Sequence, residues 1–466
     1  MLFNSLEFIL FFPLVTLTYF LIPHKFRWIQ LFIASCIFYA AFIPSYLLIL
    51  FALILIDFFA GILIEERSNK KFWLTVSIIA NLGLLFLFKY YNFFVTNINS
   101  LSGTQFILLH FALPIGLSFH TFQSLSYTIE VFRGKQKAVR HLGYYSLYVM
   151  FYPQLVAGPI ERPYHLLPQL QKKHTFSSQN LYEGLRLMAW GFFKKTVIAD
   201  RLSSYVDSVF TNPDHFPASN IWVAVLFFTI QIYADFSGYS DIALGAARCI
   251  GIELMINFNR PYQSWNIREF WKRWHISLSS WFRDYVYIPL GGKKKGRLQK
   301  NANIMITFIL SGFWHGAGWN FLLWGALHGT YLLLYNFYAD NFRKIKIPFI
   351  ASYLLTMIAV SFAWIFFRSS DLQHALTIIK KAFTPDQFSF QSLTSLSTPA
   401  FQYGNFSFLL IFLGCGLMFG IEKVTNPLLT NLNNNKTLDI LLFTFIVLFI
   451  IFYGVFHKTS FIYFQF

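Results

Sequence analysis

Residues 304–324 read IMITFILSGFWHGAGWNFLLW and place a histidine, His315, inside a long apolar run. Basic residues flank this run at 293–300 and within 335–346. An ionisable side chain at membrane depth is energetically expensive, so such groups usually face the interior of a helix bundle or a water-filled cavity. A second histidine, His275, lies in residues 269–281, which read EFWKRWHISLSSW. These two histidines are therefore the first candidates for a functional site.

The composition is that of a polytopic membrane protein. Hydrophobic residues make up 56% of the chain and charged residues only 12%, whereas a soluble domain carries roughly 25% charged residues. Apolar runs long enough to cross a bilayer recur from residue 6 to residue 456. No polar stretch is long enough to separate domains, which predicts one membrane domain over residues 1–466.

The net charge of +17 would suit a nucleic-acid-binding protein if the chain were soluble. Here the lysines and arginines lie in short loops between apolar runs, and the positive-inside rule accounts for most of the excess. We therefore expect no nucleic-acid partner. The cysteines Cys36, Cys249 and Cys415 are widely scattered, which indicates neither a disulfide framework nor a zinc site.

The distribution of basic loops predicts an orientation in the membrane. Basic loops at 24–27, 65–71 and 133–141 follow the first, third and fifth candidate spans, whereas the loops between them carry no Lys or Arg. Odd-numbered spans should therefore end inside, with the N-terminus outside. The N-terminal run lacks a basic region and a cleavage site, which predicts a first transmembrane helix. The runs near 150–160 and 303–315 are short, and we expect re-entrant or broken segments there.

Residues 231–248, QIYADFSGYSDIALGAAR, bring polar side chains into an apolar context. Asp235 and Asp241 would be carboxylates within the membrane unless this segment reaches water. One interpretation is a helix break at Ser237 and Gly238, where polar groups satisfy the freed backbone. The other is that these side chains line a substrate cavity or orient another site residue. Both interpretations stay open on the sequence alone.

A helix is predicted to begin at Asn266. Its side chain can cap the first turn of a helix, and a glutamate follows three positions later. Arg268 and Lys272 share one face of this helix, and Trp271 and His275 share another. Aromatic residues among basic ones are typical of an interfacial helix. These side chains could anchor the helix at the lipid surface, or form a cationic surface for a phosphate-bearing acyl donor. The two roles are compatible.

The segment around His315 also has a structural interpretation. Gly312 and Gly316 have the spacing of a Gly-x-x-x-Gly motif, which is typical of close helix packing. A single histidine on an apolar face is more often structural than catalytic. A functional role is favoured here because a second histidine, tryptophans and intramembrane carboxylates occur in the same chain. Composition alone equally allows a transporter or lipid-linked sugar flippase, in which such groups relay protons.

Six motifs occur together along the chain: MLFNSLEF at 1–8, LPIGLSFHTFQSLSY at 113–127, YPQLVAGPI at 152–160, DFSGYSD at 235–241, FWKRWHISL at 270–278 and GFWHG at 312–316. As a set they resemble the membrane-bound O-acyltransferase family. The resemblance is to the bacterial branch that includes the membrane subunits of alginate and peptidoglycan O-acetylation and, more distantly, the teichoic acid D-alanylation protein. It covers nearly the whole chain.

This resemblance implies an all-α polytopic membrane protein. The family's fold is a ring of transmembrane helices around a thinned centre with a tunnel, accompanied by re-entrant and interfacial helices. His315 corresponds to the family's membrane histidine, and His275 to its second polar site residue. Family members take an acyl group from a cytoplasmic thioester and deliver it toward a hydroxyl on a glycan or carrier outside. In this branch a periplasmic or extracellular partner acetyltransferase often completes the transfer.

Transfer of an acyl group from a thioester to oxygen requires a base that takes the hydroxyl proton. A neutral histidine, with an ordinary pKa of about 6.5, suits this role at neutral pH. We therefore expect His315 to be the general base. We expect His275 to orient the donor or acceptor, or to polarise the thioester carbonyl. An acyl-histidine intermediate stays open, and no metal site is expected.

The other polar and aromatic residues of these motifs are expected to line the tunnel or to bind the donor. The expected tunnel residues are Trp314, Trp271, Trp274, Asp235, Tyr239, Asp241 and Gln154. The expected donor-binding residues are Arg268, Lys272 and Arg273. The donor would be acetyl-CoA or an acyl-carrier thioester, acting as substrate with no tightly bound cofactor. The resemblance implies the cytoplasmic (inner) membrane as location, with the bilayer, a glycan acceptor, a partner acetyltransferase and an acyl carrier protein as partners.

Overall fold

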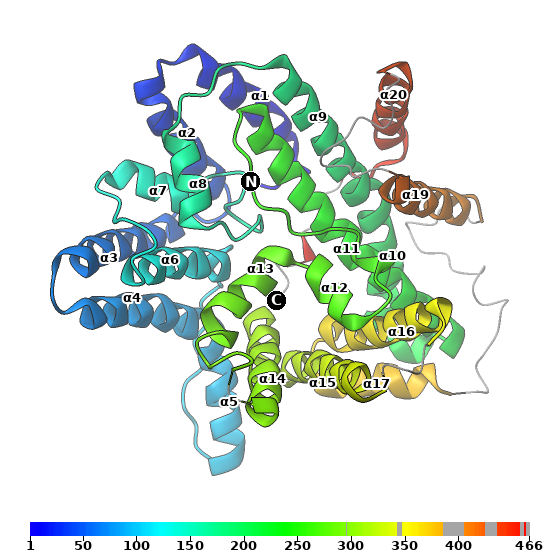
Figure 1. Cartoon of the computed structure of the whole chain (residues 1–466). Coiled ribbons are helices and arrows are strands. Elements are labelled where there is room, and N and C mark those ends of the chain that lie inside the picture. Colours follow the sequence, from blue (N-terminus) through cyan, green and yellow to red (C-terminus); the bar gives the residue numbers. More distant parts are fainter. Residues whose placement is uncertain (295, 343–346, 385–404, 425–435, 457–460, 463–466) are drawn as a thin grey trace. The chain divides into compact units, whose positions relative to one another are not determined.

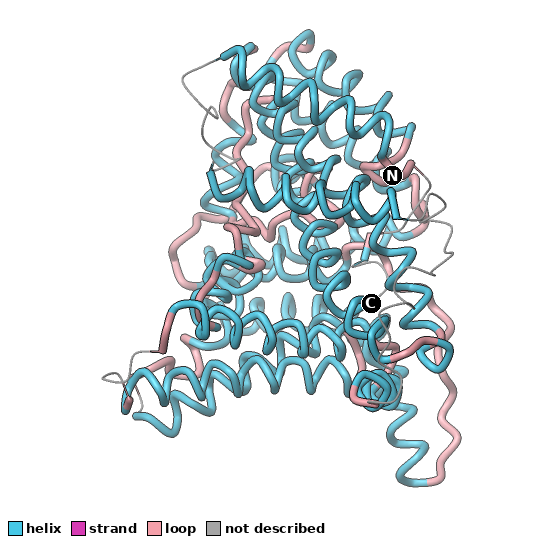
Figure 2. Tube along the Cα trace, turned by 90° about the vertical axis from the view of Figure 1, so that its right-hand side faces the viewer, coloured by secondary structure: helices cyan, strands magenta, loops and turns pink. Residues whose placement is uncertain are grey.

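The computed structural model describes residues 1–294, 296–342, 347–384, 405–424, 436–456 and 461–462. The regular structure within these residues is helical, with no strand among them (Figure 1 and Figure 2). The expected all-α fold is confirmed. Among the described residues, four helices are long and apolar enough to cross a membrane. They are Tyr46–Glu66, Lys70–Ser102, Ala218–Cys249 and Phe349–Arg368.

The chain forms two compact units. The first comprises Met1–Met188 and Tyr239–Ile256, and the second comprises Ala189–Gly238 and Asn257–Phe466. Their boundaries fall inside two helices, α9 (Ser178–Phe192) and α11 (Ala218–Cys249). The expectation of a single membrane domain over residues 1–466 stays a prediction.

The first unit contains the helices that precede α9. In chain order they are α1 (Leu6–Leu21), α2 (His24–Ala40), α3 (Tyr46–Glu66), α4 (Lys70–Leu85), the π-helical turn η1 (Phe86–Tyr90), α5 (Tyr91–Ser102), α6 (Leu117–Phe132), α7 (Leu142–Met150) and α8 (Pro163–Gln171). Residues 151–162 between α7 and α8 are not helical. The expected break after residue 150 is therefore present.

A buried polar network joins α3, α4 and α6 within this unit. The Ser77 hydroxyl donates to Asp57 Oδ1 at 2.6 Å and lies 3.1 Å from Thr128 Oγ1. The Asn81 amide donates to Asp57 Oδ2 at 2.8 Å. Apolar side chains drive membrane helices together only weakly, because lipid tails are equally apolar, so hydrogen bonds between helices contribute to their association.

The second unit contains the remaining helices. They are η2 (Phe193–Ala199), α10 (Asp200–Thr211), η3 (Pro213–His215), η4 (Pro261–Gln263), α12 (Ile267–Arg273), α13 (Ile276–Phe282), η5 (Arg283–Tyr287), α14 (Gly296–His315), α15 (Trp319–Asn341), α16 (Phe349–Arg368), α17 (Leu372–Ala382), α19 (Asn405–Val424) and α20 (Lys436–Tyr453). Helix α12 begins as the sequence predicts, because the Asn266 side chain accepts the Glu269 backbone N–H at 2.8 Å.

Helix α11 runs without interruption through Ser237 and Gly238. The possible break at these residues is therefore wrong. The glycine has a packing role instead: a Cβ on Gly238 would lie 2.7 Å from the backbone oxygen of Gly191. Only a residue without a side chain allows the backbone of α9 to approach so closely.

Helices α14 and α15 form a tightly packed hairpin. A Cβ on Gly312 would lie 2.2 Å from the Phe321 carbonyl oxygen, and one on Gly325 would lie 2.3 Å from the Phe308 carbonyl oxygen. The close-packing interpretation of Gly312 is confirmed. Helix α14 is continuous over its 20 residues up to His315. A break within 303–315 is therefore wrong, while a re-entrant course of this segment stays a prediction; the chain turns at residues 316–318, just beyond the histidine.

Gly325→Ala should lower the temperature of thermal unfolding in detergent. The added methyl group meets rigid backbone, and overpacking of this kind destabilises by about 1–3 kcal/mol. The matched control is Gly83→Ala in α4, where a Cβ meets no atom within 4 Å. Because alanine favours helix over glycine by about 1 kcal/mol, the control should unfold at the same or a higher temperature. Equal unfolding temperatures for the two variants would contradict the packing described here.

Candidate active site

The two histidines selected from the sequence lie together in the second unit. His315 is the last residue of α14, and His275 immediately precedes α13. Their ring centroids are 6.4 Å apart. Both side chains are buried, with 5% of His315 and 1% of His275 exposed. Residues separated by 40 positions in the sequence thus form one pair of imidazoles in the interior.

His275 is positioned by a tight turn between α12 and α13. Its backbone has φ of 42°, in the left-handed region that residues with a side chain rarely adopt. Asn257 stabilises this turn: its carbonyl oxygen accepts the Ile276 N–H at 2.8 Å, and its side-chain oxygen accepts the Ser277 hydroxyl at 2.6 Å. The expectation that Trp271 and His275 share a helix face is wrong, because α12 ends at Arg273.

Aromatic rings surround both imidazoles. The ring of His315 lies 4.9 Å from Trp314, 5.2 Å from Trp324 and 5.2 Å from Phe367, all approximately edge to face. The ring of Phe236 lies 4.7 Å from that of His275. Such surroundings exclude water and disfavour a charged imidazole. Burial accordingly lowers the pKa of His275, which lies in the turn after α12, well below its usual range. His275 is therefore neutral at neutral pH.

The wall behind His315 is held by α16. The Asn320 amide at the start of α15 donates to the carbonyl oxygens of Phe366 and Ser369, at 3.2 Å and 2.8 Å. These bonds fix the C-terminal end of α16 and thereby Phe367 against His315. The ring of Trp324 packs almost parallel to that of Trp364 on α16, 5.7 Å away.

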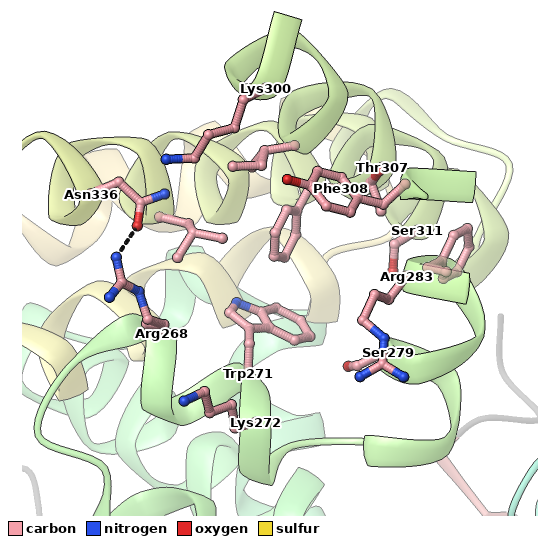
Figure 3. Close-up of a pocket in the computed structure, with 14 residues that line it drawn as sticks. Arg268, Trp271, Lys272, Ser279, Arg283, Lys300, Thr307, Phe308, Ser311 and Asn336 are labelled. Carbon is pink, nitrogen blue, oxygen red and sulfur yellow. Dashed lines mark hydrogen bonds between the residues drawn. The ribbon is translucent and has the colours of Figure 1, made fainter. Parts of the chain in front are cut away.

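A cavity of about 400 Å³ lies beside this site, between α12 and α14 (Figure 3). Arg268, Trp271 and Lys272 of α12 line it; in Figure 3 Trp271 points toward Phe308 of α14 and Arg268 toward Asn336 of α15. The α14 residues that line it are Lys300, Ile304, Thr307, Phe308 and Ser311. Ser311 lies one helical turn before His315, so the cavity follows the face of α14 that leads to the histidine.

Four of the described residues that line the cavity are basic and none of them is acidic. Of the predicted donor-binding residues, Arg268 and Lys272 line it, and Arg283 and Lys300 join them. Arg268 donates to the Asn336 side-chain oxygen at 2.5 Å, which fixes its guanidinium in the wall (Figure 3). Arg273 is not among the lining residues; it pairs with Glu269 at 2.7 Å. Sequence reasoning missed Arg283 and Lys300 because they belong to other elements and share no local motif with α12.

The predicted tunnel residues occupy different environments. In the second unit, Trp271 lines the basic cavity, Trp314 contacts His315, and buried Trp274 packs on Trp364 with ring centroids 5.0 Å apart. Asp235 forms an ion pair with Lys195 at 2.5 Å. Its other carboxylate oxygen accepts a hydrogen bond from the Ile462 N–H at 2.8 Å. Both of its carboxylate oxygens are thus engaged by the protein.

Three further predicted residues belong to the first unit. The buried Gln154 side chain donates to the Tyr148 carbonyl oxygen at 2.8 Å. The buried Tyr239 ring packs on Phe3, 4.5 Å away, and Asp241 is half-buried. No group of three or more His, Cys, Asp or Glu side chains in the described part of the chain converges as metal ligands would.

Comparison with known proteins decides the family. The model of the membrane-bound O-acyltransferase (MBOAT) family matches residues 106–370, which include both histidines and the basic cavity. The chain belongs to the MBOAT family. The protein is therefore a membrane-bound O-acyltransferase, and this finding selects the enzyme over the transporter or flippase that composition alone allowed.

Named relatives cover most of this chain. It is 36% identical over 417 residues to the peptidoglycan O-acetyltransferase of Helicobacter pylori, covering 82% of this chain and 79% of that protein. It is 36% identical over 414 residues to the probable alginate O-acetylase AlgI of Azotobacter vinelandii, covering 86% and 82%. It is 29% identical over 296 residues to the teichoic acid D-alanyltransferase of Bacillus subtilis, covering 60% and 72%.

Proposed function

We propose that this protein moves an acetyl group from a cytoplasmic thioester donor across the membrane for O-acetylation of a cell-surface glycan, either peptidoglycan or an alginate-like exopolysaccharide. The observation that carries this proposal is the pair of buried imidazoles, 6.4 Å apart, beside a basic cavity. The names of the relatives support acetyl as the group and these glycans as acceptors.

In the proposed reaction His315 is the general base. It takes the proton of the acceptor hydroxyl while the oxygen attacks the thioester carbonyl, and it returns this proton to the departing thiolate. His275, neutral because it is buried, donates an N–H to the carbonyl oxygen as negative charge develops there. The ester bond to oxygen forms as the bond to sulfur breaks. The surrounding tryptophans and phenylalanines exclude water that would otherwise hydrolyse the thioester.

The donor's phosphates are proposed to bind in the basic cavity. Acetyl-CoA and an acyl carrier protein both present a phosphopantetheine arm, and Arg and Lys are the usual phosphate ligands in proteins. Four basic side chains line the cavity, and its apolar part contains Trp271 and Phe308. An arm lying along α14 from Lys300 toward Ser311 would direct its thioester to His315, one helical turn further on.

The protein is further proposed to lie in the cytoplasmic membrane with its N-terminus outside, and to pass its acyl group to a periplasmic or extracellular partner acetyltransferase. Single cysteines tested with a membrane-impermeant reagent check the orientation. Ser100→Cys and Lys137→Cys both introduce the thiol at an exposed position. Because the basic loop 133–141 should face the cytoplasm, only Ser100→Cys should react from outside. If only Lys137→Cys reacts from outside, the protein has the opposite orientation, with its N-terminus inside.

His315→Ala should abolish acetyl transfer while leaving expression and membrane insertion near wild type. Loss of a general base lowers the rate by about 10²–10⁴-fold. The measurement is transfer of labelled acetyl from acetyl-CoA to muropeptides or oligoalginate by purified protein, with and without its partner acetyltransferase. His110→Ala, at an exposed histidine of the first unit, controls for the loss of an imidazole and should keep normal rates. Substantial activity in folded His315→Ala protein would refute the assignment of the base.

Lys272→Ala should mainly raise the donor KM, because it removes binding that is equal in the ground and transition states. A charge-assisted hydrogen bond contributes about 1.5–3 kcal/mol, so the expected increase is about ten- to a hundredfold. Arg273→Ala removes a positive charge from the same helix but outside the cavity, and its KM should stay close to wild type.

Salt gives a second test of the same cavity. Added salt should raise the wild-type donor KM and affect the Lys272→Ala variant less, because the screened attraction is already reduced. If both variants instead change insertion or unfolding temperature at constant KM, the basic residues of α12 anchor the helix at the lipid surface.

A further inference from the structure

A third histidine, which the sequence analysis did not single out, lies near the catalytic pair. His328 is on α15 and has 0% of its surface exposed. Among the described residues, neither of its ring nitrogens has a hydrogen-bond partner. A buried polar atom left without a partner destabilises the folded state, and native structures contain few of them. A phenylalanine would fill this position without that penalty, so the imidazole requires an explanation.

The explanation begins with the rings that pack on His328. Trp271 lies 4.9 Å away with an interplanar angle of 89°, and Trp324 lies 4.8 Å away at 68°. These edge-to-face arrangements allow an N–H group to point at an aromatic face, which is a weak but directional interaction. The imidazole therefore contacts both indoles in a defined orientation, which an apolar ring would not specify in the same way.

These two indoles belong to the two halves of the site. Trp271 lines the basic cavity and packs on Phe308, another lining residue, with ring centroids 5.0 Å apart. Trp324 packs edge to face against His315 at 5.2 Å. The two tryptophans also contact each other at 5.9 Å. One imidazole thus contacts a wall of the cavity and a wall of the catalytic histidine at the same time.

The tryptophans around His328 also have buried ring nitrogens without hydrogen-bond partners among the residues that the structure describes. Within the described part of the chain, Nε1 of Trp271, Trp324 and Trp364 likewise has no hydrogen-bond partner. Trp364 lies 6.2 Å from His328 and packs on Trp324. Apolar rings at these positions would leave no buried N–H without a partner and would therefore give a more stable folded state. Polar rings whose edges and faces match one another instead restrict how the cluster can pack.

We propose that His328 is a positioning residue, which fixes Trp324 against His315 and Trp271 against the donor cavity so that the thioester and the base meet in one geometry. It acts through the two tryptophans and contacts no substrate. This inference rests on the proposed acyl transfer. A misplacement of about 1 Å in a reacting geometry can lower a rate by about 10²-fold, an effect comparable in free energy to the cost of leaving a buried polar atom without a partner.

The test compares His328→Phe with His328→Gln in purified protein, using acetyl-CoA as donor. The phenylalanine keeps a ring and removes both unpartnered nitrogens, so the unfolding temperature should stay equal or rise. The kcat should nevertheless fall by about tenfold or more. The glutamine restores an N–H donor and an acceptor, and its kcat should lie clearly above that of His328→Phe. Tyr331→Phe, which alters a ring 5.8 Å from the imidazole, is the matched control and should keep the wild-type kcat.

Wild-type kcat in His328→Phe, or equal losses of kcat in folded His328→Phe and His328→Gln, would overturn the proposal. If His328→Phe does not fold, His328→Leu takes its place beside His328→Gln: a kcat clearly higher in His328→Gln than in His328→Leu supports the positioning role, and equal kcat values refute it. Failure of the acyl-transfer proposal itself looks different, because then the wild-type protein transfers no acetyl group from any thioester donor.

Discussion

The backbone contact between α14 and α15 is the constraint on which the rest of the site depends. Gly312 and Gly325 allow each helix to approach a carbonyl oxygen of the other. Trp324 immediately precedes Gly325, and His315 lies one turn beyond Gly312 in the sequence. The contact that brings the two backbones together therefore also brings the indole of Trp324 within 5.2 Å of the imidazole of His315. A side chain at either glycine would separate His315 from the ring of Trp324.

A buried ion cluster lies next to the ring that packs on His275. Lys195 lies between Asp200 and Asp235, at 2.8 Å and 2.5 Å, and all three side chains are buried. Buried charges are tolerated only when they are paired and hydrogen-bonded. Asp235 immediately precedes Phe236, whose ring packs on His275, and its other oxygen accepts the Ile462 N–H. Asp235 was expected to line a substrate cavity or to orient another site residue; its bonds to Lys195 and Ile462 agree with the second role, and the tunnel assignment stays a prediction.

Local rules predicted the parts of the site that local chemistry determines. The cap at Asn266, the shared face of Arg268 and Lys272, and the close packing at Gly312 all follow from residue spacing, and the structure contains each of them. The turn at His275 could not be predicted in this way. Its positive φ is locally unfavourable, and the bonds that stabilise it come from Asn257, eighteen residues earlier.

The same limit applies to the cavity and to the third histidine. Arg283 and Lys300 join the α12 residues only when η5 and α14 pack beside that helix. His328 occurs in the sequence as a single histidine in an apolar helix, for which a structural role is the usual expectation. Only the packed structure reveals that its ring contacts both Trp271, which lines the cavity, and Trp324, which packs on His315. Tertiary contacts, which spacing does not encode, decide these features.

Uncharged aromatic walls around His315 suit the role of a base that the proposed reaction gives it. A carboxylate beside an imidazole would favour the charged imidazolium, which cannot accept a proton. The rings of Trp314, Trp324 and Phe367 carry no charge and meet the His315 ring at interplanar angles of 78°, 85° and 70°. Edge-to-face contacts orient the imidazole through the partial charges of the rings, while their bulk excludes water. In the proposed reaction the base thus remains neutral and correctly oriented until the acceptor hydroxyl supplies its proton.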